Sequence, residues 1–133
     1  MPTYEPIDVG VPVEASRSYL VDFQWATSGI VADFLMPFDE EHLLRVTFDG
    51  ECIVRLLDEM ALSTEDDQPP VGLVAEHLAY RVEGATFAAT QSSTWKAAFG
   101  PIKHFRFITG WACLDVLTGV MPAFSVVACS NGR

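Results

Sequence analysis

The sequence has few of the residues and motifs from which common enzyme and metal sites are built. Its 133 residues include only three histidines and three cysteines, and no Cys-x-x-Cys pair occurs. It contains no glycine-rich phosphate loop, no Gly-x-Ser-x-Gly turn and no His-Glu-x-x-His helix motif. We therefore predict no metal site and no cofactor, and no residue is assigned a catalytic role from a motif.

The cysteines and the apolar segments argue against an exported or membrane-spanning chain. Cys52, Cys113 and Cys129 are odd in number and far apart, which is typical of reduced, buried thiols in a cytosolic protein. Residues 1–10 contain two acidic residues and lack the basic and apolar pattern of a signal peptide. The longest apolar stretch, 116–129, is interrupted by polar residues, glycine and proline, and is too short to span a bilayer. A soluble cytoplasmic protein is expected.

Basic residues are scarce and unevenly distributed. The chain has eight Lys and Arg residues and eighteen Asp and Glu residues, which gives a formal net charge of −10. Nucleic acids and anionic membranes are therefore not expected as partners, because both are bound mainly through basic side chains. Residues 1–67 hold fifteen acidic and three basic residues, whereas residues 68–133 hold three acidic and five basic ones. The acidic half is expected mainly to confer solubility, with binding of a basic protein as the alternative.

The length and composition favour one compact domain. Half of the residues are hydrophobic and 20% are charged, somewhat below the typical quarter or so. Apolar surface patches are therefore expected, and a homo-oligomer such as a homodimer is an open possibility. Residues 1–16 include three prolines and are predicted to form an extended N-terminal arm before a single β-rich domain over 17–133.

Short apolar segments separated by turn residues predict a mainly β fold, with an α+β fold as the alternative. About nine strands are predicted, over 18–25, 30–36, 44–48, 52–57, 73–82, 85–90, 102–108, 112–117 and 123–128. The segment 73–82 can also be read as a helix. Asp49-Gly50 is expected to form the type I′ turn of a β-hairpin joining 44–48 to 52–57. Sequential antiparallel pairing of these strands predicts a strongly curved sheet or a closed barrel.

One short helix is predicted near residues 93–99. Ser92 or Ser93 can accept a hydrogen bond from an unpaired amide at its start. Gly100 can adopt the left-handed conformation that ends a helix, and Pro101 prevents its continuation. The helix has only about two turns and therefore depends on packing against the rest of the fold.

The first candidate site is formed by His104, Arg106 and Asp115. With a two-residue turn at 109–110, His104 faces Asp115, and Arg106 faces Cys113 on the same side of the hairpin. A histidine–carboxylate pair beside an arginine could orient a general base or bind an anion. The alternative is a structural ion pair in which Arg106 satisfies a buried Asp115. The opposite side of the hairpin is expected to be apolar, with Phe105, Phe107, Leu114 and Val116.

The second candidate site comprises His77, Tyr80 and Arg81, together with Glu76. These polar side chains lie close enough in sequence to line a pocket. If the segment is a strand, however, alternation places Glu76 and Tyr80 on one face and His77 and Arg81 on the other. The acidic run 39–42 contains metal-ligand residue types without the spacing of a known site, and the run 63–67 could dock a basic partner. Both runs are expected to be solvated connections.

Three functions remain open on these grounds. A non-catalytic protein-interaction module is the first, because the charge is asymmetric and catalytic motifs are missing. A small-ligand-binding β-barrel is the second, because the aromatic residues could line an apolar cavity. An enzyme that uses His104 and Asp115 in acid–base chemistry is the third.

Overall fold

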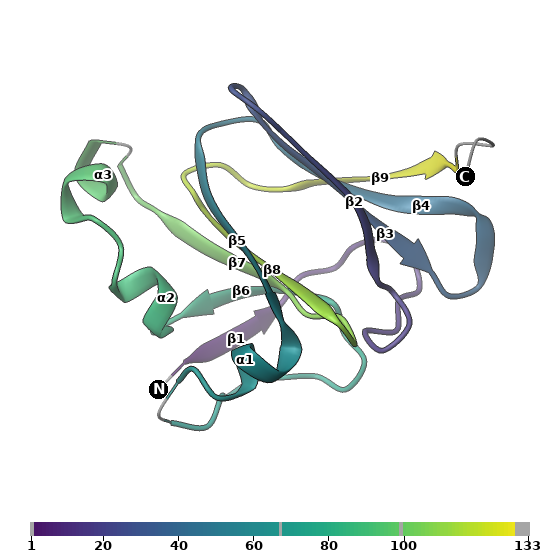
Figure 1. The fold of residues 1–133 in the computed structure, drawn as a ribbon, viewed down its shortest axis with the longest axis horizontal. Coiled ribbons are helices and arrows are strands. Elements are labelled where there is room, and N and C mark those ends of the chain that lie inside the picture. The colour runs from purple at the N-terminus through teal and green to yellow at the C-terminus, as the bar shows by residue number, and fades with distance from the viewer. Residues whose placement is uncertain (1, 67, 99, 130–133) are drawn as a thin grey trace.

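The computed structural model describes residues 2–66, 68–98 and 100–129 (Figure 1). These residues form nine strands and three short helices, which confirms the prediction of a mainly β fold. The elements are β1 (Thr3–Pro6), β2 (Leu20–Ala26), β3 (Gly29–Met36), β4 (Asp39–Phe48), β5 (Cys52–Asp58), α1 (Glu59–Ser63), β6 (Ala79–Glu83), α2 (Thr86–Ala89), α3 (Ser93–Ala98), β7 (Lys103–Phe107), β8 (Ala112–Thr118) and β9 (Ala123–Ala128). None of the helices described is long and apolar enough to cross a membrane.

The strands form two antiparallel sheets. One has five strands in the order β1-β6-β7-β8-β5, and the other has four in the order β2-β3-β4-β9 (Figure 1). Within the described residues no closed barrel is found, so the predicted strongly curved sheet or barrel is not confirmed. The three helices all lie in segments that join strands of the five-stranded sheet.

The core lies between the two sheets and follows from the alternation of apolar residues along the strands. Its fully buried members include Ile30, Ala32, Phe34, Leu44, Val46, Phe48, Ala79, Phe105, Phe107, Leu114 and Val116. Phe34 stacks on Phe107 with ring centroids 5.6 Å apart, and Phe48 lies 5.5 Å from Phe105. These aromatic rings therefore pack against one another across the sheets instead of surrounding an open space. Each buried phenylalanine contributes roughly 1.5–3 kcal/mol to stability.

The hairpin predicted at Asp49-Gly50 was wrong. β4 pairs with β3 and β9, whereas β5 pairs with β8, so the chain passes here from one sheet to the other. Neither Asp49 nor Gly50 has the positive φ angle that a type I′ turn requires. Turn residues indicate where a chain changes direction, but the packing of the two strands on different sheets decides their partners.

Several smaller predictions also differ from the structure. The segment 85–90 contains helix α2 instead of a strand, which suits its alanine-rich sequence. Asp39–Glu41, expected as a solvated turn, form the first residues of β4. Only the end of 73–82 is a strand, β6. Within the predicted N-terminal arm, β1 joins the five-stranded sheet by pairing with β6.

The predicted helix near 93–99 is present as α3. The Trp95 amide donates to Ser92 Oγ at 3.2 Å, as expected for a capping serine. Gly100 adopts the left-handed conformation, with a φ of 71°. Phe99, the last residue of the predicted helix, lies outside the described residues.

Candidate functional site

The outer face of the five-stranded sheet brings His104, Arg106 and Asp115 together. In the β7–β8 hairpin Arg106 lies opposite Asp115, and His104 lies opposite Leu117. The connecting loop therefore has four residues, 108–111, and the predicted register was wrong by two positions. A shift of two positions keeps every side chain on its own face. The three polar residues consequently remain neighbours, and the apolar side of the hairpin still faces the core.

Asp115 is fully buried and accepts hydrogen bonds on both carboxylate oxygens. Its Oδ1 accepts from His104 Nε2 at 2.7 Å and from Arg106 Nε at 2.6 Å. Its Oδ2 accepts from Arg55, with Nη2 at 2.6 Å and Nε at 3.1 Å. Burial alone would raise the pKa of Asp115, but the hydrogen bond from His104 and the charge of Arg106 lower it to about 2. Asp115 is therefore ionised at neutral pH, and it fixes the hydrogen of His104 on Nε2.

Arg55 was not among the predicted site residues. It lies opposite Asp115 in the β5–β8 pair and also forms a bidentate ion pair with Glu65, which follows α1. The centre of its guanidinium lies 4.1 Å from the Phe87 ring of α2. The acidic segment after α1, which was expected to be solvated, is therefore held against the sheet by Arg55. If β5 had been expected to pair with β8, Arg55 would have been predicted beside Asp115. The Asp49-Gly50 turn instead predicted that β5 pairs with β4.

Arg106 connects this network to the N-terminal strand. Its side chain is fully buried, and its Nη1 donates to Tyr4 Oη at 2.6 Å. The same Nη1 lies 3.8 Å from Asp66 Oδ2, and Nη2 lies 3.7 Å from Glu65 Oε1. These two contacts are too long for hydrogen bonds, and Nη2 has no hydrogen-bond partner in the described part of the chain.

The arrangement around Asp115 favours a structural role over acid–base catalysis. A carboxylate with a pKa of about 2 has little tendency to take up a proton near neutral pH. Phe87 packs over His104 with ring centroids 5.7 Å apart, and the His104 side chain is almost fully buried. His104 and Asp115 are therefore held away from solvent, as expected for an ion network that joins strands to the segments above them.

The residues of the second candidate site do not form a common pocket with one another. His77 Nε2 lies 2.7 Å from Ile7 O. The Tyr80 hydroxyl donates to Val74 O at 2.8 Å and accepts from the Val74 amide at 3.1 Å. Arg81 lies opposite Glu5 in the β1–β6 pair, on the other face from Tyr80. His77 and Tyr80 thus hold the segment before β6 in place.

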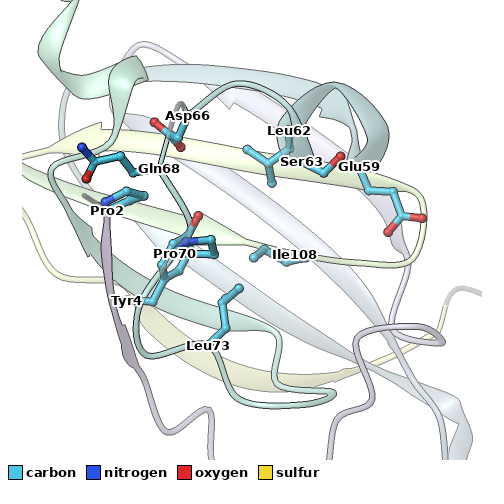
Figure 2. Close-up of a pocket in the computed structure, with 10 residues that line it drawn as sticks. All are labelled: Pro2, Tyr4, Glu59, Leu62, Ser63, Asp66, Gln68, Pro70, Leu73 and Ile108. Atoms are coloured by element: carbon cyan, nitrogen blue, oxygen red, sulfur yellow. The ribbon is translucent and has the colours of Figure 1, made fainter.

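A pocket of about 370 Å³ opens beside this network, between α1 with the segment after it and β1 with residues 70–73 (Figure 2). Its apolar walls come from segments far apart in the sequence, and they comprise Pro2, Leu62, Pro70, Leu73 and Ile108. Its polar lining comprises Tyr4, Glu59, Ser63, Asp66 and Gln68. The pocket lies on the outer side of the five-stranded sheet, away from the core between the sheets.

Tyr4 and Asp66 belong to both the pocket and the network. Tyr4 is 7% exposed, and burial raises the pKa of its hydroxyl, so it remains protonated. Its oxygen accepts from Arg106, and the described contacts leave its hydrogen free to donate. Asp66 Oδ1 accepts from the amide and the hydroxyl of Thr86, both at 2.8 Å, and so fixes the start of α2. Tyr4 was not predicted, and Asp66 was named only as part of the run 63–67, because both acquire these neighbours only through tertiary contacts.

Comparisons with protein-family models, with curated proteins and with solved structures give no match. In residues 2–66, 68–98 and 100–129, no three His, Cys, Asp or Glu side chains gather as a metal site requires. The pocket and its polar lining are therefore the basis for the functional proposal.

Proposed function

We propose that this chain is a non-catalytic binding protein whose pocket beside Tyr4 takes a small, largely apolar molecule. The pocket volume of about 370 Å³ falls within the range of about 300–1,000 Å³ that is usual for small-molecule sites. The observation that carries the proposal is the convergence of five apolar side chains from separate segments on a buried, anchored tyrosine. Apolar walls with a few fixed polar groups are the usual composition of such sites.

The contacts around the pocket support a preformed site. Tyr4 is held by strand pairing, by Arg106 and by an edge-to-face contact with Tyr80 at 5.4 Å. On the opposite wall, Glu65 is paired with Arg55 and Asp66 holds the start of α2. A site that is already ordered before binding loses less conformational entropy when the ligand enters.

The proposal is tested with a neutral apolar probe such as 1-hexanol, titrated into the protein and followed by amide NMR. We expect saturable shifts centred on Leu62, Leu73 and Ile108. Leu73→Trp should fill the pocket and abolish the response, whereas Val126→Trp should leave it intact. The control is well matched, because Leu73 is 48% and Val126 is 45% exposed, and Val126 lies on β9. Unchanged binding by Leu73→Trp, or no saturable binding at all, would contradict the proposal.

A protein-interaction function is a second candidate, supported by a group of exposed apolar side chains at one end of the four-stranded sheet. The group comprises Tyr19, Val21, Leu35 and Phe38. Val21 lies on β2, an edge strand of its sheet, and Leu35 lies on the neighbouring β3, where its amide bonds to Tyr19 O. An edge strand beside exposed apolar residues is suited to adding an extended segment of a partner.

The occupant proposed for this edge is a basic segment of another protein, because residues 1–67 carry twelve more acidic than basic residues. A lysine-rich extended peptide should bind at low salt and be released as salt rises. Val21→Lys should weaken that binding by adding a like charge at the edge, whereas Val126→Lys should not. Salt-insensitive binding, or self-association through this edge instead, would contradict a basic partner.

A further inference from the structure

We infer that the pocket beside Tyr4 selects a small apolar amine, whose ammonium group binds Asp66 while its carbon body fills the apolar part. This inference rests on the proposed ligand-binding function and names the chemical class of the ligand. Figure 2 shows Asp66 and Glu59 on opposite sides of the pocket, with Leu62 and Ile108 between them. Asp66 and Glu59 are the two charged residues that line the pocket, and both are acidic.

Asp66 has one carboxylate oxygen that is well placed for a ligand. Its side chain is only 13% exposed, and Oδ1 is occupied by Thr86. The nearest cation to Oδ2 is Arg106 Nη1, at 3.8 Å, and that nitrogen already donates to Tyr4. A carboxylate oxygen that has no hydrogen bond and belongs to a largely buried side chain favours a charged N–H donor.

The surrounding network gives this carboxylate one distant arginine and no hydrogen bond to Oδ2. Arg55 and Arg106 donate their hydrogen bonds to Asp115, Glu65 and Tyr4, and Arg106 reaches Asp66 only at 3.8 Å, about as far as it lies from Glu65. These two arginines face three carboxylates, counting Asp66, so carboxylates outnumber arginines beside the pocket. An anionic ligand would be repelled by Asp66 and Glu59, and a neutral one would leave Asp66 Oδ2 without a charged partner.

Tyr4 adds the second polar contact. Its side chain is more than nine-tenths buried, and its hydroxyl hydrogen has no acceptor among the described contacts. Arg106, which donates to the same oxygen, makes that hydroxyl a stronger hydrogen-bond donor. A ligand that carries an acceptor near its ammonium, such as an amino alcohol or an amino ether, satisfies Asp66 and Tyr4 together.

Three probes with the same aromatic body separate the possibilities by charge: 2-phenylethylamine, 2-phenylethanol and phenylacetate. Calorimetric titration of the full chain at neutral pH and low salt should show the amine binding about tenfold tighter than the alcohol, from one charge-assisted hydrogen bond. Phenylacetate should bind most weakly. Asp66→Asn, which keeps an oxygen to hold Thr86, should bring the ratio of amine affinity to alcohol affinity down to about one.

Glu40→Gln is the matched control, since it makes the same change in net charge on β4, and it should leave all three affinities unchanged. If Asp66→Asn does not fold, Glu59→Gln, at an exposed position, should lower the ratio of amine affinity to alcohol affinity about threefold. Equal binding of the amine and the alcohol to the native chain would overturn the amine inference while leaving the proposed function intact. Binding of none of the three probes would overturn both.

Discussion

Arg55 and Asp115 lie sixty positions apart in the sequence but directly opposite each other on β5 and β8, where Arg55 Nη2 donates to Asp115 Oδ2 at 2.6 Å. This contact joins the edge strand β5 to the centre of a buried ion network. Arg55 also binds Glu65, so the same side chain fixes the segment that forms one wall of the pocket. The stability of the sheet and the shape of the pocket therefore depend on shared residues.

Asp115→Asn should destabilise the fold by about 3–5 kcal/mol, because it removes the counter-ion that the buried Arg106 shares with the partly buried Arg55. Urea denaturation followed by circular dichroism measures the change. Glu83→Gln, at an exposed position on β6, should change the free energy of unfolding by no more than about 0.5 kcal/mol. A loss below about 1 kcal/mol for Asp115→Asn would show that the network contributes little to stability.

The free energy of unfolding should fall at low pH as Asp115 becomes protonated. Its folded-state pKa of about 2 lies below the ordinary value of 3.8. A depressed pKa stabilises the fold above the unfolded-state value, and this contribution is lost as the pH falls from about 4 to 2. It amounts to about 2 kcal/mol. The pKa of Asp39 is also lowered, chiefly by its hydrogen bond with His42. The measurement is therefore the difference between the native chain and Asp115→Asn, which should shrink as the pH falls through that window.

Tyr4→Phe should cost about 1–3 kcal/mol, because the buried Arg106 Nη1 loses the oxygen to which it donates. Hydrogen exchange should also become faster in β1, since Tyr4 anchors this edge strand. Tyr19→Phe is the control at a more exposed tyrosine, and we expect no measurable change there. Equal stability of the two variants would mean that the contact between Tyr4 and Arg106 is not maintained in solution.

Gly72→Ala should damage the pocket wall more than Gly10→Ala damages its loop. Both glycines have positive φ angles, 97° and 82°, so both substitutions introduce backbone strain. A Cβ at Gly72 would lie 2.0 Å from Tyr4 O, whereas one at Gly10 would meet nothing within 4 Å. We expect a loss of about 1 kcal/mol at Gly10 and a clearly larger loss at Gly72. Thermal unfolding of the two variants compares them directly, and similar losses would contradict the close approach at Gly72.

The alternation of apolar and polar side chains along the strands gave most of the correct predictions. It predicted the apolar and polar faces of the β7–β8 hairpin correctly, because an error of two positions in register leaves each face unchanged. It also placed most of the strands that form the core. The helix α3 was predicted from Ser92 and Gly100, which act within their own segment and need no distant partner.

The remaining features depend on which strands pair, and single-sequence signals do not decide that. Asp49-Gly50 predicted a hairpin of β4 and β5. Because β5 was therefore not expected beside β8, Arg55 was not predicted to contact Asp115. Tyr4 gave no local signal in its proline-rich segment, and Asp66 was recognised only as one member of the acidic run 63–67. Their importance comes from Arg106 and Thr86, residues far away in the sequence.

The hydrogen bond from the Thr86 amide to Asp66 Oδ1 has a practical consequence for ligand discovery. Any molecule that contacts the Asp66 carboxylate changes the electron density of the oxygen to which this amide donates. The Thr86 amide resonance is therefore an intrinsic, label-free reporter of the pocket, although α2 itself contributes no atom to the pocket lining. Screening compound mixtures against this one signal would separate binders of the pocket from molecules that bind elsewhere on the surface.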